Sequence, residues 1–143
     1  MTRGLKNNNP FNMNRTLTMW LGEVQGDDER FASFKTLEYG IRAGLINLYN
    51  GYFSNRLTVR RIVMKYSPPQ DNKSKEDPDG MISVEGYIKT IVKRSGVGSE
   101  EIVSKGSWLK VAEAILYHEN GMVVKTVNEL GRICVKYNLI NYL

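Results

Sequence analysis

The sequence predicts a single domain of the α+β class in which helices predominate. A length of 143 residues suits one hydrophobic core. Apolar residues recur at spacings of three and four after residue 35, which is typical of helices packed on a core. The preceding residues are rich in Asn, Gly and Thr and lack that spacing. We therefore expect one domain, 1–143, with an Asn-rich loop and hairpin over 1–35 and a helical part over 36–143.

A small β-hairpin is expected near the start of the chain. Its turn is predicted at Gly26, Asp27 and Asp28, with residues 30–34 as the returning strand. Five segments after it carry the helical spacing, so we expect about five helices. Their predicted N-caps are Thr36, Thr58, Ser83, Ser107 and Thr126. The charged stretch 70–80, which contains Pro and Gly, is expected to be a surface loop.

The composition excludes several classes of protein. Hydrophobic residues make up 41% and charged residues 24%, which is ordinary for a globular domain. The longest apolar run, 43–53, is too short to cross a bilayer, so no membrane insertion is expected. The first residues lack the apolar region of a secretory signal peptide. One cysteine and one histidine cannot build a disulfide framework or a His/Cys zinc cluster, so we predict no metal, no cofactor and chemistry based on carboxylates.

The net charge of +5 favours polyanionic partners such as nucleic acid, anionic headgroups or cell wall. The basic residues are scattered, and no helix-turn-helix spacing or aromatic-basic strand motif is present. A small nucleic-acid-binding protein is therefore the weakest of the alternatives.

One carboxylate stands on an apolar helix face. Glu119 follows Ile115 by four positions and Leu116 by three, so it continues the apolar stripe of the helix predicted to begin after Ser107. Asn120 and Gly121 then form a typical left-handed helix end. Burial and the negative end of the helix dipole both favour the protonated form of a carboxyl placed there, as a general acid for glycosidic cleavage requires. The alternative is a helix-end glutamate that reaches solvent or pairs with Lys125. His118 lies at the edge of the same face.

Several motifs resemble a group of phage and prophage virion proteins. They are residues 3–10 (Arg-Gly-Leu-Lys-Asn-Asn-Asn-Pro), 20–22 (Trp-Leu-Gly), 31–34 (Phe-Ala-Ser-Phe), 40–43 (Gly-Ile-Arg-Ala), 66–72 (Tyr-Ser-Pro-Pro-Gln-Asp-Asn), 87–88 (Tyr-Ile) and 114–121, which ends in His-Glu-Asn-Gly. The sequence departs from the group at Phe11, where Gly is usual, at Tyr66 for Trp and at Asp71 for Glu.

The resemblance implies a lysozyme-like domain that cleaves peptidoglycan, in the manner of a muramidase or a lytic transglycosylase. In related wall glucosaminidases and transglycosylases the helix ending in Glu precedes the Asn-rich segment and hairpin. Here that order is reversed, which would be a circular permutation of the lysozyme-like fold. The implied partners are glycan strands and other virion proteins. The implied location is the virion, or the host cytoplasm before release, with action on the bacterial wall.

In this interpretation Glu119 protonates the leaving glycosidic oxygen. A glycosidase also needs a second carboxylate. The candidates are Glu23, Asp27, Asp28 and Glu29 around the hairpin and Asp71 in the loop, and Glu23 is the first choice. A transglycosylase dispenses with it, because the muramyl 6-hydroxyl attacks instead of water. The residues expected to bind substrate are Asn7, Asn8, Asn9, Trp20, Asp71, His118 and Asn120. For the three asparagines, bonding the backbone of a tight loop is an equally good interpretation. The alternative function is a non-catalytic virion or wall-binding module on the same fold.

Overall fold

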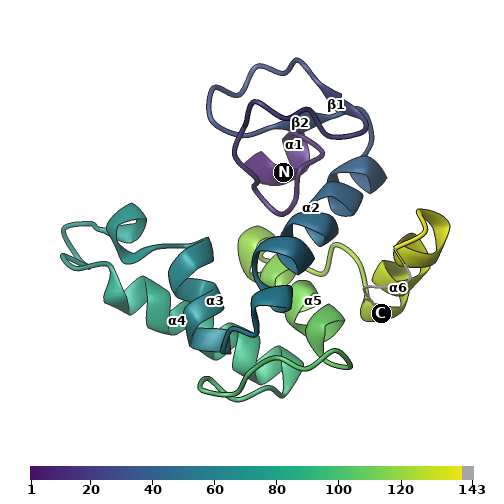
Figure 1. Ribbon diagram of the computed structural model, residues 1–143. Coiled ribbons are helices and arrows are strands. Elements are labelled where there is room, and N and C mark those ends of the chain that lie inside the picture. The colour runs from purple at the N-terminus through teal and green to yellow at the C-terminus, as the bar shows by residue number, and fades with distance from the viewer. Residues whose placement is uncertain (140–143) are drawn as a thin grey trace.

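The computed structural model, which describes residues 1–139, consists of a small N-terminal lobe set on a helical body (Figure 1). The lobe contains the helix α1 (Arg3–Lys6) and the strands β1 (Glu23–Val24) and β2 (Ser33–Phe34). The body contains α2 (Leu37–Gly51), α3 (Val59–Tyr66), α4 (Met81–Ser95), α5 (Trp108–Asn120) and α6 (Val127–Lys136), with short 3₁₀ turns η1 (Phe53–Asn55) and η2 (Pro69–Asn72). The predicted class, α+β and mostly helical, is confirmed.

The hairpin is shorter than predicted. β1 and β2 pair in antiparallel register, with Glu23 opposite Phe34 and Val24 opposite Ser33. Phe31 forms only an isolated bridge, to Asn14, so the returning strand does not extend over 30–34. The helix α1 was not predicted, because four residues are too few to show a helical period. The Thr2 hydroxyl caps it by accepting a hydrogen bond from the Leu5 amide.

Three of the predicted N-caps are confirmed by their hydrogen bonds. Thr36 and Thr58 accept from the amides of Tyr39 and Arg61. Thr126 and Glu129 form a reciprocal capping box at the start of α6. Ser107 precedes α5 as predicted, although its side chain makes no capping bond.

The prediction that Ser83 caps α4 was wrong. The helix begins three residues earlier than that prediction implies, at Met81, after Gly80 in the left-handed conformation. The capping group is the buried carboxylate of Asp77, which accepts hydrogen bonds from the amides of Ile82 and Ser83 at 3.0 and 2.9 Å. Asp77 lies in the preceding turn, so the stretch 70–80 supplies part of the helix start as well as a surface loop.

Helix α5 runs through the centre of the body, and α1, α4 and α6 pack against it. Its residues Val111, Ala112, Ile115 and Leu116 are fully buried. Within residues 1–139 no helix is long and apolar enough to span a bilayer. Because the core fixes α5 along most of its length, the position of its C-terminal end relative to the N-terminal lobe is also fixed.

Candidate functional site

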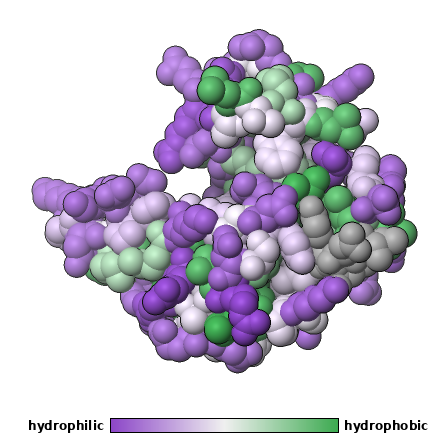
Figure 2. All heavy atoms as spheres, viewed as in Figure 1, coloured by the Kyte–Doolittle hydropathy of each residue, from purple (hydrophilic) through white to green (hydrophobic). Residues whose placement is uncertain are grey.

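A cleft lies between the N-terminal lobe and the arm formed by α3, η2 and α4, and Figure 2 shows the surface hollowed there. It consists of two adjoining hollows of about 350 and 230 Å³. Asn12, Asn14, Tyr52 and Tyr66 line both of them. Glu119 lines the larger hollow, so the carboxylate identified from the sequence faces the cleft.

Glu119 stands in the last turn of α5, which ends at Gly121 with φ of 69°. Its side chain is partly buried. The Asn12 side-chain amide donates a hydrogen bond of 2.7 Å to Glu119 Oε1. The expected placement of this carboxylate, at the end of the helix and beside a loop, is therefore confirmed, and Asn12 is a site residue that the sequence did not reveal.

Two tyrosines from neighbouring helices surround the Glu119 carboxylate. Tyr66 ends α3, and its hydroxyl donates to the carbonyl oxygen of Phe11. Tyr87 of α4 is buried, and so is its hydroxyl oxygen. Burial raises the pKa of both phenols, and the nearby charge of Glu119 raises it further. Both phenols therefore stay protonated and neutral over the physiological pH range.

The motifs 3–10 and 114–121 meet at the end of α5. The Asn120 side chain is buried and donates to the carbonyl oxygens of Pro10 and Leu116, both at 2.9 Å. Its Oδ1 accepts a hydrogen bond of 2.9 Å from the Thr2 hydroxyl. Asn120 thus joins the helix end to the N-terminal segment. We predicted a substrate-binding role for it, but the structure uses its side chain inside the protein.

The three consecutive asparagines also bond the protein itself. Asn7 donates to Asp28, Asn8 to the Phe34 carbonyl, and Asn9 to the carbonyls of Met13 and Ala32. Asn9 is fully buried. None of the three lines either hollow of the cleft. Of the two interpretations left open by the sequence, the structure matches the one in which these amides fix a tight loop.

The candidates for a second carboxylate are not equally placed. Glu23, the first choice, accepts a hydrogen bond of 3.0 Å from the Trp20 amide and does not line the cleft. Asp28 holds the lobe together, and the hydrogen bond from the Arg3 guanidinium keeps the pKa of its carboxyl well below the usual range. Asp71 alone among the candidates lines the same hollow as Glu119. Its Oδ2 lies 3.8 Å from Nη2 of Arg30.

The two remaining predicted residues lie at the sides of the site. Trp20 is partly buried and lines the smaller hollow. His118 stacks on Tyr87 with ring centroids 3.8 Å apart, and its Nδ1 lies 3.1 Å from the Thr90 hydroxyl. Burial lowers the pKa of His118, so the ring is neutral at physiological pH. It does not line either hollow of the cleft.

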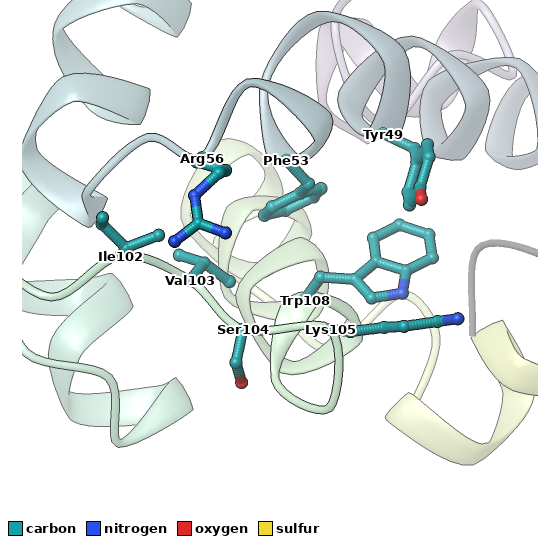
Figure 3. Close-up of a pocket in the computed structure, with 8 residues that line it drawn as sticks. All are labelled: Tyr49, Phe53, Arg56, Ile102, Val103, Ser104, Lys105 and Trp108. Carbon is teal, nitrogen blue, oxygen red and sulfur yellow. The ribbon is translucent and has the colours of Figure 1, made fainter.

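A further hollow of about 450 Å³ lies at the other end of α5 (Figure 3). Trp108, Phe53 and Tyr49 form its apolar wall, and Arg56 and Lys105 stand at its edge. None of the described residues that line it is acidic, so these residues offer no carboxylate for acid catalysis. Within residues 1–139 no group of three or more His, Cys, Asp or Glu side chains is arranged to hold a metal ion.

Comparison with known proteins adds one relative. No protein-family model matches the chain. The chain is 28% identical over 136 residues to Protein P5 of Pseudoalteromonas phage PM2, and the aligned region covers 91% of this chain and 78% of that protein. The sequence is thus similar to a phage protein over nearly its whole length.

Proposed function

We propose that the protein is a peptidoglycan-cleaving glycosidase of phage origin and that Glu119 is its general acid. One observation carries the proposal: the carboxylate of Glu119, at the C-terminal end of α5, is partly buried in the cleft between the N-terminal lobe and the arm. Carboxylic acids in such partly dehydrated clefts supply the proton in glycosidic cleavage. The cleft is open and elongated by its second hollow, which suits a polymeric chain better than a small enclosed ligand.

In the proposed reaction Glu119 gives its proton to the glycosidic oxygen between N-acetylmuramic acid and N-acetylglucosamine. The bond from the anomeric carbon to that oxygen breaks, and its electron pair leaves with the oxygen. Asp71 is the second carboxylate of the cleft and is the candidate for accepting a proton from the water that bonds to the anomeric carbon. If Asp71 is not needed, the muramyl 6-hydroxyl bonds to the anomeric carbon, its proton passes to the Glu119 carboxylate, and the enzyme is a lytic transglycosylase.

The proposal includes the fold relation and the biological setting. The order of the elements, with the Asn-rich segment and hairpin before the helix that bears Glu119, fits a circularly permuted lysozyme-like domain. The similarity to a phage protein supports a phage origin. On this basis we propose that the protein resides in the virion, or in the host cytoplasm before release, with glycan strands and other virion proteins as partners.

The test is loss of turbidity of purified Gram-negative murein with the wild type and with Glu119→Gln. Gln keeps the shape of the side chain but has no acidic proton, so activity is expected to fall on the order of a hundredfold or more. Glu76→Gln, at an exposed position outside the cleft, is the matched control and should retain full activity. Equal lysis by wild type and Glu119→Gln would remove Glu119 from the mechanism.

The products and Asp71→Asn distinguish the two mechanisms. Mass spectrometry of soluble fragments shows reducing ends for a hydrolase and anhydromuramyl ends for a transglycosylase. Asp71→Asn should reduce the yield of reducing ends strongly in the first case and change the yield of anhydro ends little in the second. Absence of lysis by the folded wild-type protein would favour the non-catalytic virion or wall-binding module.

A further inference from the structure

The Asn12 side chain is fixed on both sides, although it lies in a loop. Its Nδ2 donates the hydrogen bond of 2.7 Å to Glu119 Oε1. Its Oδ1 is buried and accepts no hydrogen bond within residues 1–139. That oxygen packs on the bare Cα of Gly4, where a Cβ would approach it to 2.6 Å. Reversal of the amide would place Oδ1 against the Glu119 carboxylate, so only one orientation is favourable.

The backbone conformation of Asn12 is uncommon. Asn12 has φ of 55°, in the left-handed region that asparagine tolerates better than most residues. Its neighbours Phe11 and Met13 are both buried in the core, which holds the loop on either side. A buried, unpaired oxygen and an uncommon backbone conformation both carry a cost to stability.

We propose that Asn12 is the positioning residue of Glu119: its amide holds Oε1 as an acceptor, so that the proton donated to the substrate is carried by Oε2. This inference rests on the proposed function of Glu119. Asn12 neither gives nor takes a proton. When the proton moves from Oε2 to the glycosidic oxygen, the same amide continues to donate to the carboxylate that remains.

Other charged and titratable groups face this carboxyl and are part of its environment. Tyr66 of α3 and Tyr87 of α4 interact with its charge, and so does His118 of α5. Arg30, Lys65 and Asp71 line the same hollow. A substitution at Asn12 leaves all six in place, so its effect isolates the amide.

Asn12→Gly is the sharpest substitution, because glycine adopts a positive φ without strain and loses only the side chain. A donor to a carboxylate stabilises the charged form, so its removal makes the proton harder to lose. The alkaline limb of the pH–rate profile should therefore move to higher pH. Turnover at the optimum should fall on the order of tenfold, because the carboxyl loses its fixed orientation.

Asn8→Gly is the matched control. Asn8 also has a positive φ, 52°, and also makes one side-chain hydrogen bond, but its partner is the Phe34 carbonyl. It should lower the midpoint of thermal unfolding and leave the pH profile unchanged. Asn12→Asp is a second variant, which replaces the donor by an acceptor and should move the alkaline limb up further than Asn12→Gly does.

The closing measurement is a carbon-detected NMR titration of the Glu119 carboxyl, assigned by its absence in Glu119→Gln. An upward move of its midpoint in Asn12→Gly, and none in Asn8→Gly, is the expected result. Equal midpoints in wild type and both Asn12 variants would overturn the positioning role. The titration does not depend on turnover, so the proposed function fails separately, through equal lysis by wild type and Glu119→Gln.

Discussion

Asn120 offers the most direct measure of how firmly the end of α5 is joined to the N-terminal segment. Asn120→Ala removes the bonds to Thr2 and Pro10, whereas the Leu116 carbonyl keeps its place in the helical ladder. Each lost bond is worth about 1 kcal/mol, and the Pro10 carbonyl, in a buried residue, is left without this donor. After the small gain in helix propensity from alanine, the free energy of unfolding should fall by about 2 kcal/mol.

Urea denaturation followed by far-ultraviolet circular dichroism measures this change. With an m-value of about 2 kcal/mol per M, the midpoint should fall by about 1 M. The control is Asn128→Ala, an exposed asparagine of α6, which should change the unfolding free energy by less than about 0.5 kcal/mol. A double-mutant cycle with Thr2→Ala should give a coupling of about 0.5–1 kcal/mol. A loss below about 1 kcal/mol in Asn120→Ala, or strict additivity with Thr2→Ala, would refute this account of the junction.

Two further predictions concern the helices. Gly40→Ala in α2 would place a Cβ 1.7 Å from the Asn8 carbonyl oxygen and should destabilise the protein by more than about 2 kcal/mol. Gly86→Ala, at an exposed position of α4 where a Cβ would meet nothing within 4 Å, should stabilise it by about 0.5–1 kcal/mol. Equal urea midpoints for the two variants would contradict the close approach of α2 to the Asn-rich loop. Burial opposes ionisation of Asp77, but hydrogen bonds from Ser83 and Ile82 outweigh it and lower its pKa. The stabilisation by Asp77 should therefore be complete above about pH 4 and disappear as the pH falls further. The difference in urea midpoint between wild type and Asp77→Asn should accordingly shrink from pH 6 to pH 3. A difference independent of pH would count against the capping role.

The elements that the sequence predicts well are those whose causes lie within one turn of helix. Thr126 and Glu129 satisfy each other three residues apart, so the start of α6 follows from local chemistry. The position of Glu119 follows from its spacing to Ile115 and Leu116, which the core then fixes. Ser83 shows the limit of such rules: a serine stands where a cap is expected, but its own amide is bound by a carboxylate six residues earlier.

The composition of the site depends on partners distant in the chain. Asn12 becomes significant only through Glu119, 107 residues later, and no local pattern connects the two. The sequence does not show whether the neighbouring asparagines face the cleft or the loop, because their hydrogen-bond partners Ala32 and Phe34 lie across the hairpin. The Glu23 carboxylate accepts a hydrogen bond from the Trp20 amide instead of facing the cleft. The backbone shape of the turn decides that orientation, and the sequence does not reveal it.

The junction between the N-terminal segment and the end of α5 also sets the order in which the site is completed during synthesis. Thr2, Pro10 and Asn12 are made before their partners, which follow 118, 110 and 107 positions later. Until α5 leaves the ribosome, the N-terminal segment has nothing to dock on, and its few short elements bury too little surface to fold alone. The lobe and the carboxylate therefore come together only after α5 has been made, so a wall-cleaving activity carried by Glu119 would arise no earlier than that.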